Sequence, residues 1–343
     1  MRIALDATYS VDPHPTGIGV YSNELLLGLA RQYPRDVFLH CYRPKQFIRA
    51  AGARAPNVRR RLLQPPLPLF GVELFHALNQ RVDRRPAGKV VSTFHDLFVM
   101  TEEYSSPEFR ERFTEQAKRA AENSDLIVAV SEFTANEVTR LLGFDRSRIR
   151  VIPHGVRVAT YTAPHKREKI VLFVGALQAR KNIARLVEAF ESAPADWQLI
   201  LAGATTGYGS DAILDRVRAS RSRERISMPG HVTPAELQAL YSRASIFAFP
   251  SLGEGFGIPV LEAMSRGVPV IASTRPSLAE IAGGAALLVD PHRTEELEFA
   301  LRRLMSDPAL RQEYAERGYN RAKVYSWERT VKETYDVYRE LLR

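Results

Sequence analysis

The chain has 343 residues and a formal net charge of +9, from 48 lysines and arginines against 39 aspartates and glutamates. This length exceeds what one ordinary core encloses and predicts two domains, while 45% apolar and 25% charged residues exclude a disordered or fibrous chain. The single cysteine, Cys41, excludes an internal disulfide and is typical of a reducing compartment.

Buried strands are expected where a short β-rich apolar run is bounded by turn residues. In the first half of the chain these runs are residues 2–8, 37–42, 74–78, 90–96 and 125–131. In the second half they are residues 170–177, 197–203, 225–230, 246–251, 269–273 and 285–289. Amphipathic stretches of helical length separate the runs, and this alternation predicts α/β domains whose parallel sheets are covered on both faces.

A domain boundary is expected in the polar, aperiodic segment 155–169, because a new strand starts at Ile170. Apolar residues recur at helical intervals from Trp327 to Leu342 and predict a long final helix. The predicted parts are domains at residues 1–160 and 161–326 and a C-terminal helix at residues 327–343. Two doubly wound domains predict a central cleft, with ligands at the carboxyl ends of the strands.

The stretch "SLGEGFGIPVLEAMSRGVPVIAS", residues 251–273, places two carboxylates, Glu254 and Glu262, around a glycine-rich turn. Pro259 suits the first turn of a helix, and Gly267 suits a left-handed C-cap. Amides at the start of such a helix bind phosphate or hydroxyl oxygens, and the carboxylates can accept hydrogen bonds from sugar or ribose hydroxyls. The alternative is that both glutamates only complement the helix dipole.

The segment "EGFGIPVLE" resembles the E-x7-E signature of retaining nucleotide-sugar glycosyltransferases of family GT4. Other segments, among them "TGIGVYSNELLLGLA", "STFHDLF", "VIPHGV" and "VGALQARKNIARLVEAF", follow the order of that family, so the resemblance covers essentially the whole chain. It implies the GT-B fold, in which two Rossmann-like doubly wound domains face a central cleft. The first domain would bind the acceptor, the second would bind the donor, and the last helix would pack back on the first domain.

The resemblance assigns donor-binding roles position by position. Glu254 matches the glutamate that contacts the donor sugar, and Glu262 matches the one that binds the nucleotide ribose. The backbone amides beside sugar and phosphate would come from Gly255, Phe256 and Gly257. The residues that match the family's nucleobase loop are Gly230, His231 and Val232.

Lys181 matches the lysine that neutralises the donor diphosphate, and Arg180 lies beside it in sequence. Fixed cations stabilise the charge on a departing diphosphate; the alternative is a solvated basic turn. Many relatives carry arginine after the glycine that matches Gly175, where this chain has Ala176, so either Arg180 compensates or the phosphate is held less tightly. The forms "RKN" and "HDL" resemble a subgroup rich in mannosyltransferases.

Gly17 and Gly19 resemble the start of a dinucleotide-binding fingerprint at a strand-to-helix turn. Ser22 occupies the third glycine position and no ribose-binding acid follows, which argues against a nicotinamide site. The resemblance instead assigns these glycines to a close approach of the donor diphosphate, although Val20 stands where relatives often have arginine.

His95 ends a strand at the place where the family's histidine lies near the transferred sugar; a lone histidine there is otherwise structural. The catalytic candidates are therefore His95, Arg180, Lys181 and Glu254. The candidates on the acceptor side are Asp96, Tyr21 and His76; the alternative for Tyr21 is to cap and pack the helix, and His76 would at most line the cleft of the first domain. His154 stands where relatives carry asparagine, and we expect it to shape a turn.

The expected reaction is a metal-independent, retaining transfer of a hexosyl group, with mannose from GDP-mannose as the first choice, to a glycan or lipid-linked glycan. No Asp-x-Asp pair, zinc-ligand spacing, Walker A or Gly-x-Ser-x-Gly motif occurs, so we expect neither metal nor cofactor. One alternative is a UDP-sugar donor carrying glucose, galactose or N-acetylglucosamine. Another is a nucleotide-sugar-binding module without transfer activity.

The positive charge calls for an acidic partner, and the absence of nucleic-acid-binding motifs argues against nucleic acid. No apolar run is long enough to span a bilayer, and the N-terminal sequence lacks the apolar core of a signal peptide, so we expect a cytoplasmic protein. Residues 59–70, "RRRLLQPPLPLF", combine cations with apolar side chains. They suit either a peripheral contact with the inner, anionic membrane surface or an exposed loop over the sheet.

Overall fold

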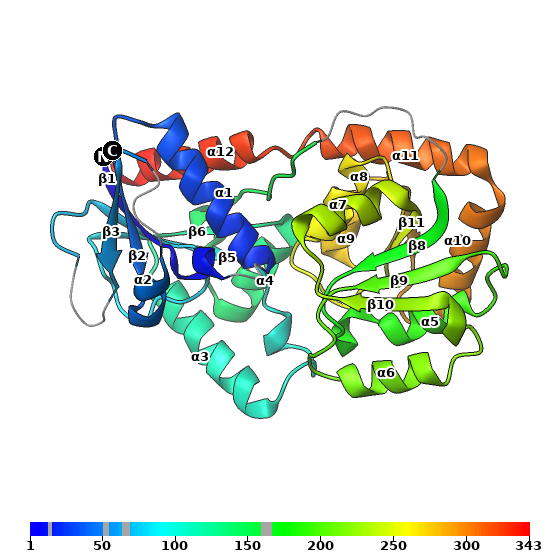
Figure 1. Ribbon diagram of the computed structural model, residues 1–343. Helices are drawn as coiled ribbons and strands as arrows, with labels where there is room; N and C mark the ends of the chain where they lie inside the picture. Colours follow the sequence, from blue (N-terminus) through cyan, green and yellow to red (C-terminus); the bar gives the residue numbers. More distant parts are fainter. Residues whose placement is uncertain (13–15, 51–54, 64–68, 159–166) are drawn as a thin grey trace. The chain divides into compact units, whose positions relative to one another are not determined.

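The computed structural model describes residues 1–12, 16–50, 55–63, 69–158 and 167–343 (Figure 1). The chain divides into two compact units. The first consists of Met1–Thr101, Ser106–Gly155 and Tyr325–Arg343, and the second consists of Glu102–Ser105 and Val156–Val324. The predicted boundaries were 160/161 and 326/327, and only the two ends of the expected linker, residues 155–169, lie within the described residues.

The described part of the first unit contains a parallel sheet of seven strands in the order β3-β2-β1-β4-β5-β6-β7. Its strands are β1 (Arg2–Asp6), β2 (Val37–Tyr42), β3 (Val58–Leu62), β4 (Leu74–Ala77), β5 (Lys89–Phe94), β6 (Leu126–Ala129) and β7 (Ile149–Val151). Five of them confirm the predicted apolar runs. The sequence analysis missed the two edge strands, because β3 reads "VRRRL" and β7 has only 3 residues; charged and short strands are typical of sheet edges.

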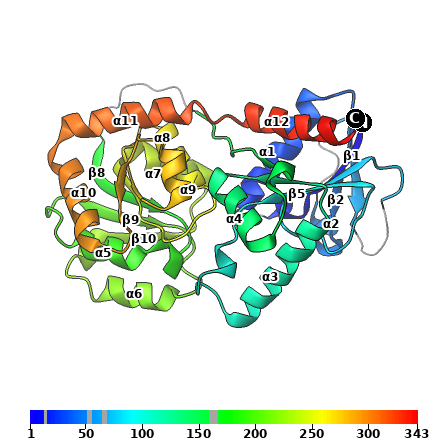
Figure 2. The ribbon, with the colours of Figure 1, turned by 180° about the vertical axis from the view of Figure 1, so that it is seen from behind.

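Helices cover both faces of this sheet (Figures 1 and 2). They are α1 (Gly17–Gln32), α2 (Pro44–Arg49), α3 (Pro107–Glu122), α4 (Glu132–Leu142) and α12 (Trp327–Leu341), with short 3-10 helices η1 (Thr8–Val11), η2 (Phe98–Met100) and η3 (Arg146–Arg148). Alternate residues of β1 face opposite sides, so that Ile3 and Leu5 join α1 and α12 in one apolar cluster while Ala4 joins α3 and α4 in another. A Cβ on Gly28 of α1 would lie 2.4 Å from Cγ2 of Val331 of α12, so the glycine allows these two helices to pack closely.

The described part of the second unit contains a parallel sheet of six strands in the order β10-β9-β8-β11-β12-β13. Its strands are β8 (Glu168–Val174), β9 (Gln198–Ala202), β10 (Ile226–Gly230), β11 (Ala244–Phe249), β12 (Val270–Ser273) and β13 (Leu287–Val289). All six confirm predicted runs, although β8 begins at Glu168 rather than Ile170.

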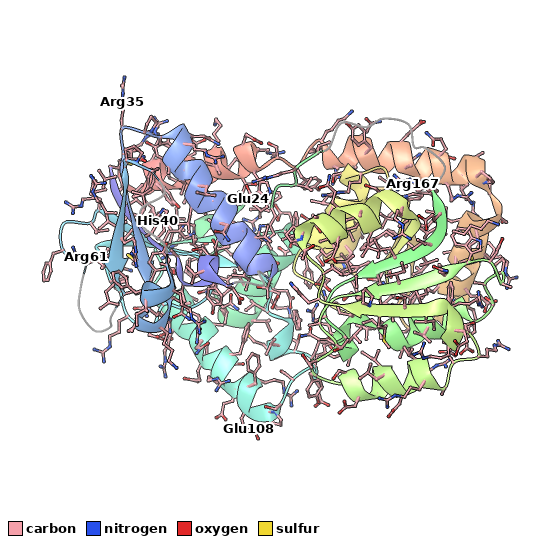
Figure 3. The ribbon with its side chains drawn as sticks, in the orientation of Figure 1. Glu24, Arg35, His40, Arg61, Glu108 and Arg167 are labelled. Atoms are coloured by element: carbon pink, nitrogen blue, oxygen red, sulfur yellow. The ribbon has the colours of Figure 1, made fainter. Side chains whose placement is uncertain are left out.

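The helices of the second unit are α5 (Ile183–Phe190), α6 (Ser210–Arg218), α7 (Pro234–Arg243), α8 (Ile258–Ser265), α9 (Pro276–Ala282), α10 (Thr294–Ser306) and α11 (Pro308–Ala322), with 3-10 helices η4 (Ala179–Lys181) and η5 (Arg223–Arg225). Arg167, labelled in Figure 3, lies just before β8. Its guanidinium donates to the carbonyl oxygens of Tyr241 and Ala244 at 2.9 Å and of Arg266 at 2.7 Å. One arginine therefore ties the start of the sheet to the ends of α7 and α8.

Both sheets reverse their strand order at one place. In the first unit the chain runs outward through β1, β2 and β3 and returns to β4 on the other side of β1; in the second it runs through β8, β9 and β10 and returns to β11 beside β8. Doubly wound sheets bind ligands at the carboxyl ends of the strands at such switch points. Ligand-binding residues are therefore expected after β1 and β4 in one unit and after β8 and β11 in the other. No helix in the described part of the chain is long and apolar enough to cross a membrane.

Candidate functional site

The carboxyl ends of β8 and β11 bring together three of the four catalytic candidates. Oε1 of Glu254 lies 2.6 Å from Nζ of Lys181 and 2.7 Å from Nη1 of Arg180, and it accepts a hydrogen bond from the Ser251 hydroxyl at 2.6 Å. The side chains of Glu254, Arg180 and Lys181 are 11%, 13% and 12% exposed. We call these four residues the Glu254 cluster.

The Glu254 carboxylate is ionised at neutral pH. Burial by itself would raise the pKa of Glu254, but the charges of Arg180 and Lys181, together with hydrogen bonds from Lys181 and Ser251, outweigh it and hold the pKa at about 2. Nζ of Lys181 also lies 4.7 Å from the ring centroid of Phe249, the last residue of β11. The cluster thus holds one fixed anion between two fixed cations.

Asn182 positions the two cations, and the sequence analysis did not single it out. It has φ 59° and is the one residue other than glycine with positive φ in the described parts of the chain. Its Nδ2 donates to the carbonyl oxygens of Pro250 at 3.0 Å and Pro291 at 2.7 Å, while the Leu252 amide donates to the Arg180 carbonyl at 2.8 Å. An asparagine directly between a basic turn and a helix was the available signal, because asparagine tolerates this left-handed conformation.

Glycines allow the ends of β8 and β9 to approach each other beside Lys181. A Cβ on Gly203, which has φ +142°, would lie 2.1 Å from the carbonyl oxygen of Gly175. Gly175 itself has φ +152°, and its own Cβ would lie 3.8 Å from Cε of Lys181. The predicted Gly175 therefore adjoins the stem of the predicted lysine, and Gly203 is a necessary neighbour that the sequence analysis missed.

The glycine turn leads into α8 as the local sequence predicts. Gly257 caps the helix with φ +111°, and a Cβ there would lie 2.5 Å from Cδ2 of Leu278. Pro259 lies in the first helical turn, and Gly267 has φ +64°, so both of these local predictions are confirmed. Gly255 and Phe256 are buried in the turn between Glu254 and the helix.

Glu262 lies in the second turn of α8. It accepts a hydrogen bond from the Tyr241 hydroxyl at 3.0 Å. Burial raises the pKa of Glu262, and the Tyr241 hydrogen bond and the charge of Arg266 oppose this rise. The two predicted glutamates thus differ: one is held ionised by paired cations, and the other accepts a hydrogen bond from a phenol and has a raised pKa.

The predicted nucleobase loop follows β10. Gly230 ends this strand with φ +74°, and its carbonyl oxygen accepts a hydrogen bond from the Gly203 amide at 2.9 Å. His231 is exposed and Val232 is partly buried. The loop therefore lies at the same sheet edge as Gly203 and the end of β9.

In the first unit His95 follows β5 and is 7% exposed. Its Nε2 lies 2.9 Å from the Leu78 carbonyl oxygen, which can only accept, so this nitrogen carries the hydrogen. Its Nδ1 then accepts from Nε2 of His154 at 3.4 Å. Burial lowers the pKa of His95 to about 4, so the ring is neutral near pH 7. His154 was expected to shape a turn, whereas it is buried as a partner of His95.

Tyr21 and His76 are core residues. The Tyr21 hydroxyl lies 2.9 Å from Oγ1 of Thr93, which also lies 2.9 Å from Nε2 of His76. Nδ1 of His76 lies 2.6 Å from the Tyr338 hydroxyl of α12. Burial lowers the pKa of His76 to about 3. Because their polar atoms bond inside the core, the structure argues against the acceptor-side role expected of Tyr21 and His76.

The remaining predicted residues of this unit lie apart from that chain of hydrogen bonds. Asp96, the third acceptor-side candidate, is partly exposed directly after His95. Gly17 and Gly19 were expected in a turn before a helix, but both lie inside the first turn of α1. Of the basic and apolar segment 59–70, residues 64–68 lie outside the described residues, while Leu62 and Phe70 are 39% and 74% exposed.

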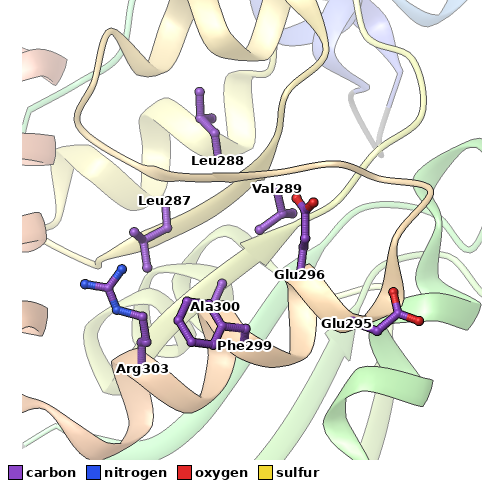
Figure 4. Close-up of a pocket in the computed structure, with 8 residues that line it drawn as sticks. All are labelled: Leu287, Leu288, Val289, Glu295, Glu296, Phe299, Ala300 and Arg303. Carbon is purple, nitrogen blue, oxygen red and sulfur yellow. The ribbon is translucent and has the colours of Figure 1, made fainter.

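A pocket of about 350 Å³ lies between β13 and α10 and contains none of the predicted site residues (Figure 4). Its lining includes Leu288, Phe299 and Arg303. Within the described ranges, no group of three or more histidine, cysteine, aspartate or glutamate side chains is arranged to hold a metal ion.

Two family models match the sequence. The model described as Glycosyl transferases group 1 matches residues 161–321, and the model described as Glycosyltransferase Family 4 matches residues 74–160. Together the matched ranges take in more than half of the chain and include both switch-point loops of the second unit.

Curated relatives include mannosyltransferases. O-antigen chain mannosyltransferase B of Escherichia coli is 29% identical over 371 aligned residues, which cover 95% of this chain and 96% of the relative. Serotype-specific mannosyltransferase WbdA of Escherichia coli is 29% identical over 276 residues, which cover 74% of this chain and 34% of that protein. D-inositol 3-phosphate glycosyltransferase of Kineococcus radiotolerans is 30% identical over 258 residues, covering 66% of this chain and 59% of the relative.

Solved structures share the two-sheet architecture. Sucrose-phosphate synthase from Thermosynechococcus elongatus has a TM-score of 0.81 at 23% identity, with 99% of each chain covered. Anabaena HepE in complex with UDP-glucose has a TM-score of 0.75 at 18% identity, covering 99% of this chain and 100% of that one. WaaG, a glycosyltransferase involved in lipopolysaccharide biosynthesis, has a TM-score of 0.73 at 14% identity, covering 98% and 99%.

Proposed function

The chain belongs to glycosyltransferase family 4 and has the GT-B fold, and we propose that it is a retaining, metal-independent hexosyltransferase. The donor we propose is GDP-mannose, and the acceptor is a glycan or a lipid-linked glycan. The observation that carries the proposal is the Glu254 cluster, where two cations and a carboxylate meet at the switch point of the second sheet. Mannose is supported by the similarity to an Escherichia coli mannosyltransferase along nearly the whole of both chains.

Arg180 and Lys181 would bind the donor diphosphate. Both pair with one oxygen of Glu254, which fixes their positions, so little reorganisation is needed when charge develops on the leaving group. The incoming diphosphate would compete with Glu254 for the two cations. Two arginine or lysine charges at this point supply the stabilisation that a divalent cation supplies elsewhere, which is why we propose a metal-independent reaction.

Glu254 would orient the sugar and would not attack it. Its three described donors all bond to Oε1, and none of the described residues donates a hydrogen bond to Oε2. An ionised carboxylate can therefore accept from a sugar hydroxyl through its second oxygen. A carboxylate held by two cations is a weak nucleophile, so we propose front-face attack, in which a leaving phosphate oxygen takes the acceptor's proton. Glu262 and its partner Tyr241 would bind the ribose.

A UDP-sugar is the second candidate donor, because a structural neighbour was solved with UDP-glucose. To distinguish the donors, the purified protein is incubated with GDP-mannose or UDP-glucose and with mannobiose as acceptor, in buffer with and without EDTA. We expect nucleotide release and a new α-mannosidic bond from GDP-mannose, unchanged by EDTA, with NMR showing the anomeric configuration of the donor. Transfer from UDP-glucose alone would replace the donor assignment, an inverted product would overturn retention, and EDTA inhibition would overturn metal independence.

The role of the cations is tested with Lys181→Met and a matched control, Lys169→Met. Lys169 pairs with Asp196 in the same unit, but both side chains are 58% exposed. Loss of a preorganised charge at the leaving group costs about 10²–10³ in rate, so we expect Lys181→Met to lose about that much transfer activity and Lys169→Met to lose less than twofold. Equal rates in the two variants would contradict the proposed role.

A further inference from the structure

Six buried side-chain oxygens in the described part of the first unit have no hydrogen-bond partner, and three of them belong to carboxyl or amide groups at or after the ends of β1 and β4. These three are Oδ2 of Asp6, Oδ1 of Asn79 and Oε1 of Gln80, in side chains that are 1%, 2% and 9% exposed. A buried acceptor without a donor destabilises the folded state, so native proteins keep few of them and usually for a reason. Three such oxygens in one neighbourhood point to a ligand that donates hydrogen bonds.

The three residues are brought together by the topology of the first sheet. β1 and β4 are parallel neighbours with Leu5 opposite His76, so Asp6 at the end of β1 lies beside the end of β4. Asn79 and Gln80 follow directly in the loop after β4. Nη1 of Arg81 donates to the Tyr9 hydroxyl at 2.9 Å, which fastens that loop to the 3-10 helix after β1.

This neighbourhood is also the switch point of the first sheet. β1 and β4 are the strands between which the strand order reverses, where a doubly wound sheet opens a crevice at its carboxyl edge. The same edge carries His95, whose Nε2–H donates to the carbonyl oxygen of Leu78, the residue before Asn79. The loop that carries Asn79 and Gln80 is therefore tied to the catalytic candidate of this unit through Leu78.

The chemistry of the three side chains selects the ligand class. Because their unsatisfied atoms are all acceptors, the ligand must donate several hydrogen bonds. A phosphate would be repelled by the carboxyl of Asp6, while Arg43 and Arg81, which act electrostatically on Asp6, oppose an organic cation. Burial raises the pKa of Asp6 against these charges. A neutral molecule with several hydroxyl groups fits these conditions.

We propose that Asp6, Asn79 and Gln80 bind the hydroxyl groups of the acceptor's terminal sugar ring at the carboxyl ends of β1 and β4. This inference rests on the proposed function, since it names the acceptor side of the same transfer reaction. It replaces Tyr21 and His76, whose polar atoms bond inside the core, by residues that each keep one side-chain oxygen without a described hydrogen-bond partner. Asn79 and Gln80 are then specificity-determining residues for the acceptor.

The test separates sugar binding from nucleotide binding and from folding. Calorimetric titrations with mannobiose and, separately, with GDP are made on the wild type and on Asn79→Leu and Gln80→Leu. Each variant removes a neutral hydrogen bond to the sugar, so we expect mannobiose affinity to fall about tenfold in each and GDP affinity to stay within twofold. Because Oδ1 and Oε1 have no described partner to lose, the melting temperatures should be equal to or above that of the wild type.

Asn57→Leu is the matched control in the same unit. Its Nδ2 donates to the carbonyl oxygens of Ala30 at 3.1 Å and Tyr33 at 3.2 Å, so this amide is structural. We expect Asn57→Leu to show the opposite pattern, a lower melting temperature with unchanged mannobiose affinity.

Wild-type mannobiose affinity in both Asn79→Leu and Gln80→Leu would overturn the proposal, and so would a wild type that binds no mannobiose. If transfer from a nucleotide sugar is detected but the acceptor KM of both variants is unchanged, the proposed function stands and the subsite fails. If no nucleotide sugar is a donor but the variants lose mannobiose affinity, the subsite stands and the transferase assignment fails.

Discussion

The two switch points of the molecule differ in the ionisation of their buried side chains. In the second unit, buried charges meet opposite charges: Glu254 is held by Arg180 and Lys181, and its pKa falls to about 2. In the first unit, two buried histidines are neutral: burial lowers the pKa of His95 to about 4 and that of His76 to about 3. Paired charges suit a charged diphosphate, and neutral histidines beside unsatisfied oxygens suit hydroxyl groups, as the proposed donor and acceptor sites require.

The contrast predicts its largest effect at Glu254. Removal of one partner from a buried ion pair leaves the other charge uncompensated, at a cost of about 3–5 kcal/mol. We expect Glu254→Gln to lower the free energy of unfolding of the second unit by that amount, measured by urea unfolding. Glu168→Gln is the control, because Glu168 pairs with Arg243 at 52% and 50% exposure and should cost about 0–1 kcal/mol. Equal losses in the two variants would mean that the cluster is solvated like any surface pair.

Acid should unfold the first unit before it weakens the second. A histidine whose pKa is lowered by folding binds its proton only in the unfolded state, so its stabilisation is complete above pH 6.5 and is lost as pH falls toward 4 for His95 and 3 for His76. The contribution of Glu254 is lost only between pH 4.5 and about 2. From pH 6.5 to 5 we expect each histidine to remove up to about 2 kcal/mol.

Hydrogen exchange measured between pH 7 and 5 checks this order. Amides of β4 and β5 should lose protection first, while those of β8 and β11 keep theirs. His76→Asn should flatten the pH dependence of the first unit. Simultaneous loss of protection in both sheets above pH 5 would contradict the predicted order of unfolding.

The smallest predicted effect concerns Glu262, which lies in the second unit but differs from Glu254 in the direction of its pKa shift. Its pKa is raised, and the Tyr241 hydroxyl is its hydrogen-bond donor. Tyr241→Phe removes this donor, and the lost positioning should weaken GDP binding by about tenfold or less, since one hydrogen bond contributes about 0.5–1.5 kcal/mol. Tyr208→Phe, at a tyrosine that is 50% exposed in the same unit, should leave GDP affinity unchanged. Calorimetric titration with GDP compares the two variants.

Local patterns in the sequence predicted most strands because burial on both faces leaves continuous apolar runs. The same rule failed for the edge strand β3, because its arginines interrupt the apolar run by which a strand is predicted. The resemblance to family GT4 identified Arg180, Lys181 and Glu254, although only the structure shows that they meet on one oxygen. Which donor-binding roles these residues perform stays a prediction.

The contacts of the supporting residues could not be predicted, because they span long sequence separations, although the place of Asn182 before a helix was a local signal for its conformation. Asn182 bonds to carbonyls 68 and 109 residues away, and His154 meets His95 across 59 residues. Tyr21 and His76 were interpreted as lining a cleft because they are polar and lie near a helix start and a strand end. The Tyr21 hydroxyl instead pairs with Thr93, and the His76 imidazole pairs with Tyr338. No short-range sequence pattern reveals these two contacts.

The position of α12 in the first unit also has a consequence for biosynthesis. Tyr338 of this helix completes the hydrogen-bond chain through His76, and Val331 packs against Gly28, yet residues 325–343 are made only after the whole of the second unit. At about 5–20 residues per second, roughly ten to thirty seconds separate the end of Ser106–Gly155 from the start of that helix. During this interval the ribosome-bound chain exposes the apolar face of α1, while the second unit, nearly continuous in sequence, can fold to completion first.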